Sequence, residues 1–176
     1  GTDLYEIFSQ FLEAGAAAYY KPDTQTFYLI EGNEGPGARP IIFHELVHTV
    51  EDQHYDLRKM NEEREDDGDA GMALKGLVEG SADFWQTLYQ DQHPEEFKAM
   101  MAAQMKPELM QKQMQMMQRV PTFLIAMMGL YPYKNGSAFL RGIGVETPAD
   151  LDAVWKDPPS STEQVLHPEK FPLDGK

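Results

Sequence analysis

Apolar residues near the start of the chain recur with the spacing of one helical face. Within residues 4–14 they occupy the first, fourth, fifth, eighth and ninth positions, namely Leu4, Ile7, Phe8, Phe11 and Leu12. Asp3 can accept hydrogen bonds from a first turn, and Gly15 is a common residue after a last turn. The pattern predicts an amphipathic helix over residues 4–14.

The next two apolar stretches are short and flank a polar turn. Residues 16–20 and 26–30 lie on either side of Lys21-Pro22-Asp23-Thr24, in which proline and aspartate favour a turn. The spacing predicts a β-hairpin. A glycine-rich loop, residues 31–37, follows the second strand.

A longer apolar stretch follows Pro40 and contains two histidines four residues apart. Residues 41–51 read Ile-Ile-Phe-His-Glu-Leu-Val-His-Thr-Val-Glu, and we expect one helix from about residue 40 to about residue 61. His44 and His48 leave one face of it, because four residues turn a helix by about 40° beyond a full turn. Two imidazoles at this spacing can hold one zinc ion, with Glu45 beside it as proton acceptor for a water.

A second helical stretch, residues 74–85, supplies the acid that such a site still needs. Glu79 and Asp83 are four residues apart among apolar residues, so they share a helical face. Glu79 can complete a His-His-Glu site with a fourth position open for water, as in catalytic rather than structural zinc sites. Asp83 can then accept a hydrogen bond from the outer nitrogen of a ligand histidine. A solvated acidic face is the alternative interpretation.

His54 is an alternative third ligand. The run from His44 to His54 has the histidine spacing of the metzincin peptidases, but Glu51 stands where they have the glycine that turns the chain back. If the helix continues through Glu51, His54 lies about 240° around the axis from His48 and faces away. Glu79 is therefore preferred as the third ligand.

The two segments together resemble the gluzincin metallopeptidases, the thermolysin-like class, in which H-E-x-x-H is followed by E-x-x-x-D on a second helix. An acidic loop predicted over residues 62–69 makes the gap between His48 and Glu79 longer than in the best-known gluzincins. Asp52-Gln53-His54 and the last part of the chain, after Pro158, are similar to those of uncharacterised bacterial zincins.

This resemblance implies a zinc-dependent hydrolase of peptide bonds, acting on a peptide or protein. It also implies one mostly helical α+β domain over residues 1–176, zincin-like, with a short hairpin or small sheet above the metal-binding helix. The strand before that helix would then form the upper rim of a cleft, where an extended peptide can pair with it. A plain core hairpin is the alternative.

A peptidase of this kind also needs a donor for the oxyanion of the reacting carbonyl. Tyr133 and Gly136 form Tyr-x-x-Gly before a predicted helix, similar to the segment with the catalytic tyrosine in some gluzincin aminopeptidases. Tyr133 is therefore a candidate catalytic residue, with Tyr131 in reserve and a structural tyrosine as the alternative. His167 is a second candidate, as a histidine has this role in thermolysin; otherwise it anchors its own loop.

Methionines gather in one region of the chain. Residues 100–128 contain nine of the eleven methionines, and Pro107 and Pro121 punctuate this stretch. Unbranched thioether side chains make adaptable apolar surfaces. We expect a pair of Met-rich helices beside the cleft, with a surface that could bind varied side chains or a protein partner.

The final part of the chain predicts two further helix starts. Thr147-Pro148 begins a stretch with apolar residues at Leu151, Val154 and Trp155. Ser160 and Glu163 have the spacing of a capping box for the next helix.

Composition narrows the possible partners. A length of 176 residues suits one domain, and the net charge of −14 argues against nucleic acid or an anionic membrane as partner. No apolar run has the length of a membrane span, and the absence of cysteine excludes disulfides and thiolate zinc sites. The chain starts with Gly1, so we expect a fragment lacking its native N-terminus, and we favour an extracytoplasmic location.

Two other classes of function remain open at this point. One is a catalytically silent, zinc-stabilised binding or scaffold domain derived from a peptidase. The other is a helical domain without metal. Glu45 argues against the silent domain, because a structural zinc site needs no general base.

Overall fold

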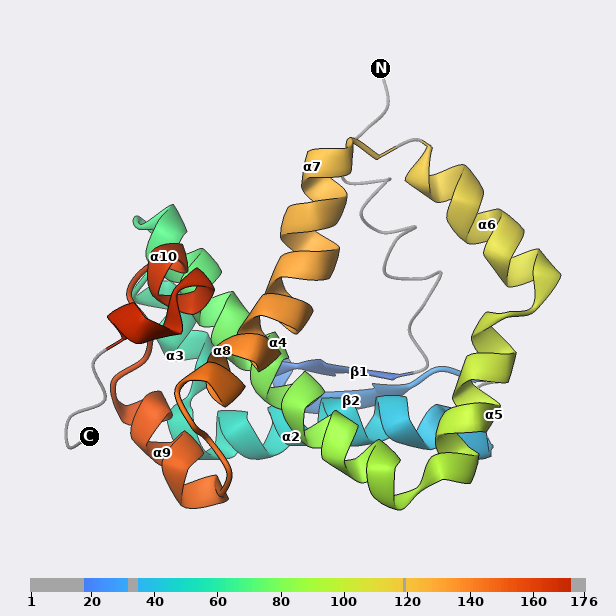
Figure 1. Ribbon diagram of the computed structural model, residues 1–176, viewed down its shortest axis with the longest axis horizontal. Coiled ribbons are helices and arrows are strands. Elements are labelled where there is room, and N and C mark those ends of the chain that lie inside the picture. The colour runs from blue at the N-terminus through green and yellow to red at the C-terminus, as the bar shows by residue number, and fades with distance from the viewer. Residues whose placement is uncertain (1–17, 32–34, 119, 172–176) are drawn as a thin grey trace.

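The computed structural model describes residues 18–31, 35–118 and 120–171. They form a mostly helical arrangement with one two-stranded antiparallel sheet, which confirms the predicted α+β class (Figure 1). The helix predicted over residues 4–14 and the beginning of the first predicted strand lie outside the described residues.

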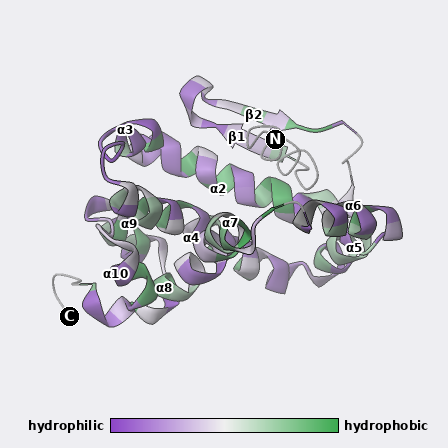
Figure 2. Ribbon diagram, turned by 90° about the horizontal axis from the view of Figure 1, so that it is seen from above, coloured by the Kyte–Doolittle hydropathy of each residue, from purple (hydrophilic) through white to green (hydrophobic). Residues whose placement is uncertain are grey.

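The predicted hairpin is present and lies against the helix that carries His44 and His48. Strands β1 (Ala18–Lys21) and β2 (Thr26–Leu29) are antiparallel and joined by the short 3-10 turn Pro22–Thr24. The hydroxyl of Tyr20 donates to the carboxylate of Asp52, 2.7 Å away on that helix. Figure 2 shows the hairpin on one side of α2 and the later helices on the other.

The single helix expected over residues 40–61 is wrong, because the structure has two helices there. Helix α2 (Arg39–Tyr55) ends at Asp56, which has a φ of 51°, and α3 (Leu57–Glu62) begins directly after it. Asp56 caps α3 by accepting from the backbone N–H of Lys59, and Asp52 accepts from that of Leu57. Aspartate tolerates the left-handed conformation and competes for backbone donors, so these two acids stop the helix.

Helix α4 (Gly68–Gln92) is the longest element and contains the second predicted motif. Asp67 caps its first turn by accepting from the backbone N–H groups of Asp69 and Ala70. The predicted acidic loop is therefore shorter than residues 62–69, since α3 runs to Glu62 and α4 starts at Gly68. Helix α4 packs against α2 on one side and against α8 on another.

The remaining elements follow in chain order. They are α5 (Pro94–Gln104), α6 (Pro107–Met117), α7 (Thr122–Ile125), the π-helical segment η3 (Ala126–Asn135), α8 (Gly136–Gly142), α9 (Pro148–Lys156) and α10 (Thr162–Leu166). Short 3-10 turns, η2 (Pro36–Ala38) and η4 (Pro168–Lys170), precede α2 and follow α10.

The helix starts near the end of the chain are nearly as predicted. Thr147 forms a capping box with Asp150 at the start of α9. The N-cap of α10 is Ser161 rather than the predicted Ser160, because the carboxamide of Gln164 accepts from the backbone of Ser160 and leaves Ser161 to cap the helix.

The apolar core is formed mainly by side chains of α4, α8, α9 and α10. Its fully buried side chains include Leu74 and Leu77 of α4, Phe139 and Leu140 of α8, and Val154 of α9. We call these four helices, together with α3 and η3, the body of the molecule. Helices α5, α6 and α7 form an arch beside it (Figure 1).

Two glycine positions let α4 and α8 touch without side chains between them. A Cβ atom on Gly80 would lie 2.3 Å from the carbonyl carbon of Gly136, and one on Gly136 would lie 1.9 Å from the carbonyl oxygen of Gly76. No larger residue fits at this crossing. The contact holds the segment that ends at Gly136 directly against the turn of α4 that carries Glu79.

Candidate metal centre

Helices α2 and α4 bring the three predicted ligands together. Nε2 of His44 lies 3.3 Å from Oε2 of Glu79, and Nε2 of His48 lies 3.5 Å from the same oxygen. The ligand atoms of the three residues lie within 4.8 Å of one another. Both histidines are buried, at 7% and 8% exposure. The group could therefore hold a metal ion.

The separations fit the ligand shell of a small tetrahedral ion. Two ligand atoms at about 2.1 Å from a tetrahedral zinc are about 3.4 Å apart. The distances of 3.3 and 3.5 Å from Glu79 to His44 and His48 match that value. One carboxylate oxygen and two imidazole nitrogens are also a donor set that zinc accepts.

Both rings turn Nε2 towards Glu79 and Nδ1 away from it. Nδ1 of His44 lies 3.1 Å from the carboxamide oxygen of Gln86. Nδ1 of His48 lies 3.6 Å from Oε2 of Glu51, an ion-pair distance longer than a hydrogen bond. The hydroxyl of Ser81 donates to the other oxygen of Glu51. Each imidazole is therefore backed by an acceptor.

The structure corrects the prediction that Asp83 backs a ligand histidine. Gln86 and Glu51 occupy the positions behind His44 and His48. Gln86 is seven residues after Glu79 and so leaves almost the same face of α4, and its side chain is longer than that of aspartate. Asp83 lies instead within electrostatic range of Tyr133 and raises the pKa of its phenol.

Sequence reasoning did not identify Glu51, Ser81 and Gln86. Helical spacing offered a signal for two of them, because Glu51 is three residues after His48 and Gln86 is seven after Glu79. Which residue backs which ring depends on the packing of α2 against α4.

Glu45 lies half-buried on α2 beside the ligands. Its Oε2 accepts a hydrogen bond of 2.9 Å from the backbone N–H of Tyr20 in β1. Burial raises the pKa of the Glu45 carboxyl, and the neighbouring His48 and His44 act in the opposite direction. A carboxylate with a raised pKa is a better proton acceptor than an exposed one.

The charges of the ligands are strongly coupled in the metal-free protein. Burial opposes the charged form of His48, but its interactions with Glu51 and Glu79 outweigh burial and raise its pKa to about 10. Burial would raise the pKa of Glu79, yet the hydrogen bonds and charges of His44 and His48 lower it well below its ordinary value. The carboxylate of Glu79 thus stays ionised, as a metal ligand must be.

Tyr133 lies beside the candidate metal ligands. Its ring stacks on that of His44, with ring centroids 5.8 Å apart. Burial and the interaction with Glu79 raise the pKa of its phenol above the ordinary value, so the hydroxyl keeps its proton. Segment η3 and the glycine contact of α8 with α4 bring it there.

Tyr131, the reserve candidate, belongs to the core instead. It is 7% exposed and packs beside Gly76 and Val165. Burial and the charge of Asp69 raise the pKa of its phenol to about 12. Among the described residues its hydroxyl has no hydrogen-bond partner.

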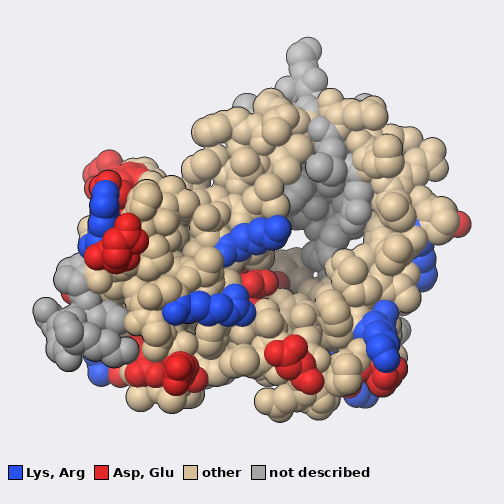
Figure 3. Space-filling model, in the orientation of Figure 1, with Lys and Arg blue, Asp and Glu red and all other residues tan. Residues whose placement is uncertain are grey.

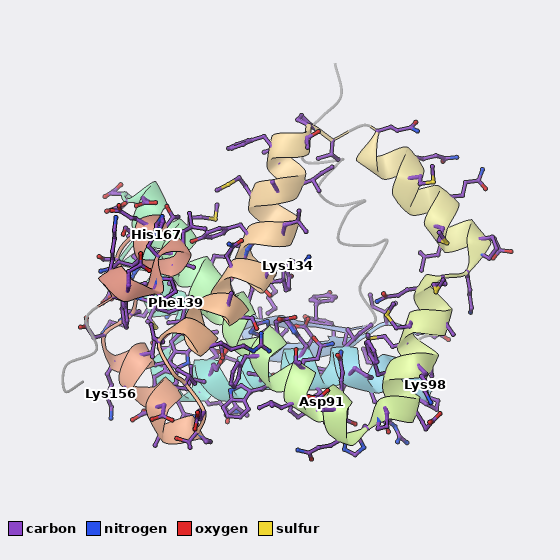
Figure 4. The ribbon with its side chains drawn as sticks, viewed as in Figure 1. Asp91, Lys98, Lys134, Phe139, Lys156 and His167 are labelled. Carbon is purple, nitrogen blue, oxygen red and sulfur yellow. The ribbon has the colours of Figure 1, made fainter. Side chains whose placement is uncertain are left out.

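Neither His54 nor His167 joins the three ligands. Helix α2 continues through His54, whose Nδ1 contacts the carbonyl of Val50 at 2.8 Å on the exposed side. His167 follows α10, is exposed and lies 3.4 Å from Glu169 (Figure 4). The structure thus places His167 at the surface, where it faces Glu169 of its own loop.

Charged side chains are unevenly distributed over one face of the molecule. On the face in Figure 3, charged side chains gather over the body and the lower helices, while the upper arch shows mainly uncharged atoms. Within the described part of the chain, no helix is both long and apolar enough to cross a membrane.

Comparison with known proteins gave no relative. No protein-family model, curated protein or solved structure matches the chain significantly. Conclusions about function therefore depend on the geometry of the centre.

Proposed function

We propose that the chain is a zinc-dependent peptidase of the gluzincin type, with a zincin-like arrangement of hairpin and metal-binding helix. The observation that carries this proposal is the convergence of His44, His48 and Glu79, in which the two distances from Glu79 to the histidines match those around a tetrahedral ion. Only three protein ligands converge among the described residues, which suits a catalytic site with a position left for water.

The chain supplies a base next to those ligands. A zinc ion held there would lower the pKa of a water and polarise the scissile carbonyl. Glu45 would take a proton from that water while the oxygen of the water bonds to the carbonyl carbon. It would then return the proton to the leaving amine as the C–N bond breaks. The raised pKa of the Glu45 carboxyl supports both halves of this role.

Tyr133 is the proposed donor to the oxyanion. Its ring lies on His44, and its phenol stays protonated because burial and Glu79 raise its pKa. A metal ion held by Glu79 would compete with the Tyr133 hydroxyl for that carboxylate, and Tyr133 would then be free to donate to a substrate oxygen. His167 is not retained as a donor, because it pairs with Glu169 on the surface.

The edge of β1 supports an extended peptide as substrate. The backbone N–H of Tyr20 points to Glu45 rather than to β2, so this edge of the strand faces the centre. A peptide lying along it could accept from the same N–H in the manner of an added strand. The side chain of Tyr20 holds the strand there through its bond to Asp52.

The test is a peptide-library cleavage assay with added zinc and with a chelator. We expect wild-type protein to cleave with zinc and to stop when the chelator removes it. Glu45→Gln should keep zinc but lose hydrolysis, because an amide cannot accept the proton. Glu62→Gln, an exposed acid at the end of α3, is the matched control and should cleave like wild type.

Each other outcome counts against the proposal. Hydrolysis by Glu45→Gln would remove Glu45 from the mechanism. A protein that binds zinc but cleaves nothing would be the silent binding domain, which the exposed methionines of the arch favour. A folded protein without bound zinc would be the helical domain without metal.

A further inference from the structure

Glu51 is a buried acid for which the proposed reaction has no use. It is 4% exposed, and it projects from α2 towards α4. Ser81 donates to one carboxylate oxygen, while the other has no hydrogen-bond partner among the described residues. A carboxylate in the interior is unfavourable unless a donor or a positive charge faces it.

The group facing that oxygen is a candidate metal ligand. Nδ1 of His48 lies 3.6 Å from Oε2 of Glu51 and likewise has no hydrogen-bond partner within residues 18–31, 35–118 and 120–171. Nε2 of the same ring lies 3.5 Å from Glu79. The ring therefore stands in line between a carboxylate behind it and the metal position in front.

His44 has the same orientation but a different partner. Its Nδ1 lies 3.1 Å from the neutral carboxamide of Gln86. The group that faces Nδ1 therefore differs between the two imidazoles. It is an acid, Glu51, for His48 and a neutral amide, Gln86, for His44.

We propose that Glu51, held by Ser81, is a positioning residue of the metal centre. Through His48 it fixes the tautomer with the lone pair on Nε2 and adds a second negative charge behind the ligand shell. This inference rests on the metal centre of the proposed function, and it assigns Glu51 to metal affinity rather than to the chemical step.

The charges of the site explain why a buried acid suits this position. Glu79 contributes one negative charge to a divalent ion, and Glu51 contributes another across the width of one imidazole. A carboxylate that accepts from the outer N–H makes the ligand nitrogen a stronger donor.

The experiment measures zinc affinity by competition with a chromophoric chelator, together with the visible spectrum of the cobalt(II)-loaded protein. Glu51→Gln should bind zinc about 10- to 100-fold more weakly than wild type and shift the cobalt spectrum. Glu65→Gln removes the same charge from an exposed position and should change neither quantity.

A second variant covers the case in which Glu51→Gln does not fold. Ser81→Ala leaves the carboxylate in place and removes only the hydroxyl that holds it, so it should weaken zinc binding measurably but by less than about 10-fold. If Ser81→Ala does so in a folded protein, the inference stands. Unchanged zinc affinity and cobalt spectrum in the folded variants would overturn it.

The outcomes separate this inference from the proposed function. A wild-type protein that binds zinc without cleaving peptides would refute the peptidase and leave Glu51 open to the same affinity test. A folded wild-type protein that binds no zinc would refute both.

Discussion

The body and the arch are both helical, but among the described residues the main apolar core lies in the body. The core cluster of described residues draws its members from α3, α4, η3, α8, α9, α10 and the loops that join them, and none from residues 94–125. In the arch, large apolar side chains are exposed instead, among them Met105, Met114 and Phe123 at 64%, 60% and 70%.

The difference shows which part of the molecule holds Glu79 and Tyr133 in place. Glu79 and Tyr133 stand on elements that are locked to each other through Gly76, Gly80 and Gly136. The arch joins the rest of the molecule at both ends. Helix α5 packs against η2, α2 and α4, with a 2.6 Å ion pair between Arg39 and Glu96, and α7 continues directly into η3. We therefore expect substitutions in the body to affect folding and metal binding, and those on the arch surface to affect neither.

The largest expected effect is that of Gly136→Ala. Its Cβ would lie 1.9 Å from the carbonyl oxygen of Gly76, so the backbones of α4 and α8 would have to separate. We expect the free energy of unfolding to fall by about 3 kcal/mol or more, measured by urea denaturation. Gly71→Ala, where the nearest atom would be 3.7 Å away, should be neutral or stabilising by about 1 kcal/mol. A Gly136→Ala protein as stable as wild type would mean that the two helices are not in contact.

A smaller effect should appear in the pH dependence of the metal-free protein. The pKa of His48 is raised from 6.5 to about 10, so its charged form stabilises the fold. That contribution is fully present below pH 6.5 and is lost as the pH rises towards 10.

The measurement is thermal unfolding between about pH 6 and pH 10. The melting temperature of chelator-treated protein should fall over this range. That of zinc-loaded protein should fall less, because the ion replaces the proton on His48. Parallel curves for the two forms would contradict the arrangement of His48 between Glu51 and Glu79.

The smallest effect should come from the arch. Met114→Gln changes a side chain that is 60% exposed and keeps a good helix former in α6. We expect stability to change by less than about 0.5 kcal/mol and zinc affinity to stay the same. A loss above about 1 kcal/mol in urea denaturation would show that this face of α6 is packed, and would remove the contrast between arch and body.

Local patterns predicted much of this structure. Helical spacing placed His44, His48 and Glu79 on two helices, and their convergence needed only one helix to lie across the other. Pro107 and Pro121 correctly marked the breaks in the Met-rich region, and the hairpin formed around its predicted turn.

The predictions that failed depend on hydrogen bonds and packing contacts that helical spacing alone does not reveal. The break at Asp56 depends on two aspartates that compete for backbone donors. Gln86 rather than Asp83 backs His44, which follows from how α4 lies across α2. His167 has the right chemistry for a donor, but α10 carries it to the surface.

The crossing at Gly80 and Gly136 also limits how this centre can be redesigned. Most helix pairs are kept apart by side chains, whose sizes can be altered to widen or narrow the gap. Here the two backbones are in direct contact. No side chain between them can be enlarged or shortened to change the distance between the turn that carries Glu79 and the segment that carries Tyr133. A different ligand set would have to be engineered from α2, where His44 and His48 can be exchanged without disturbing that contact.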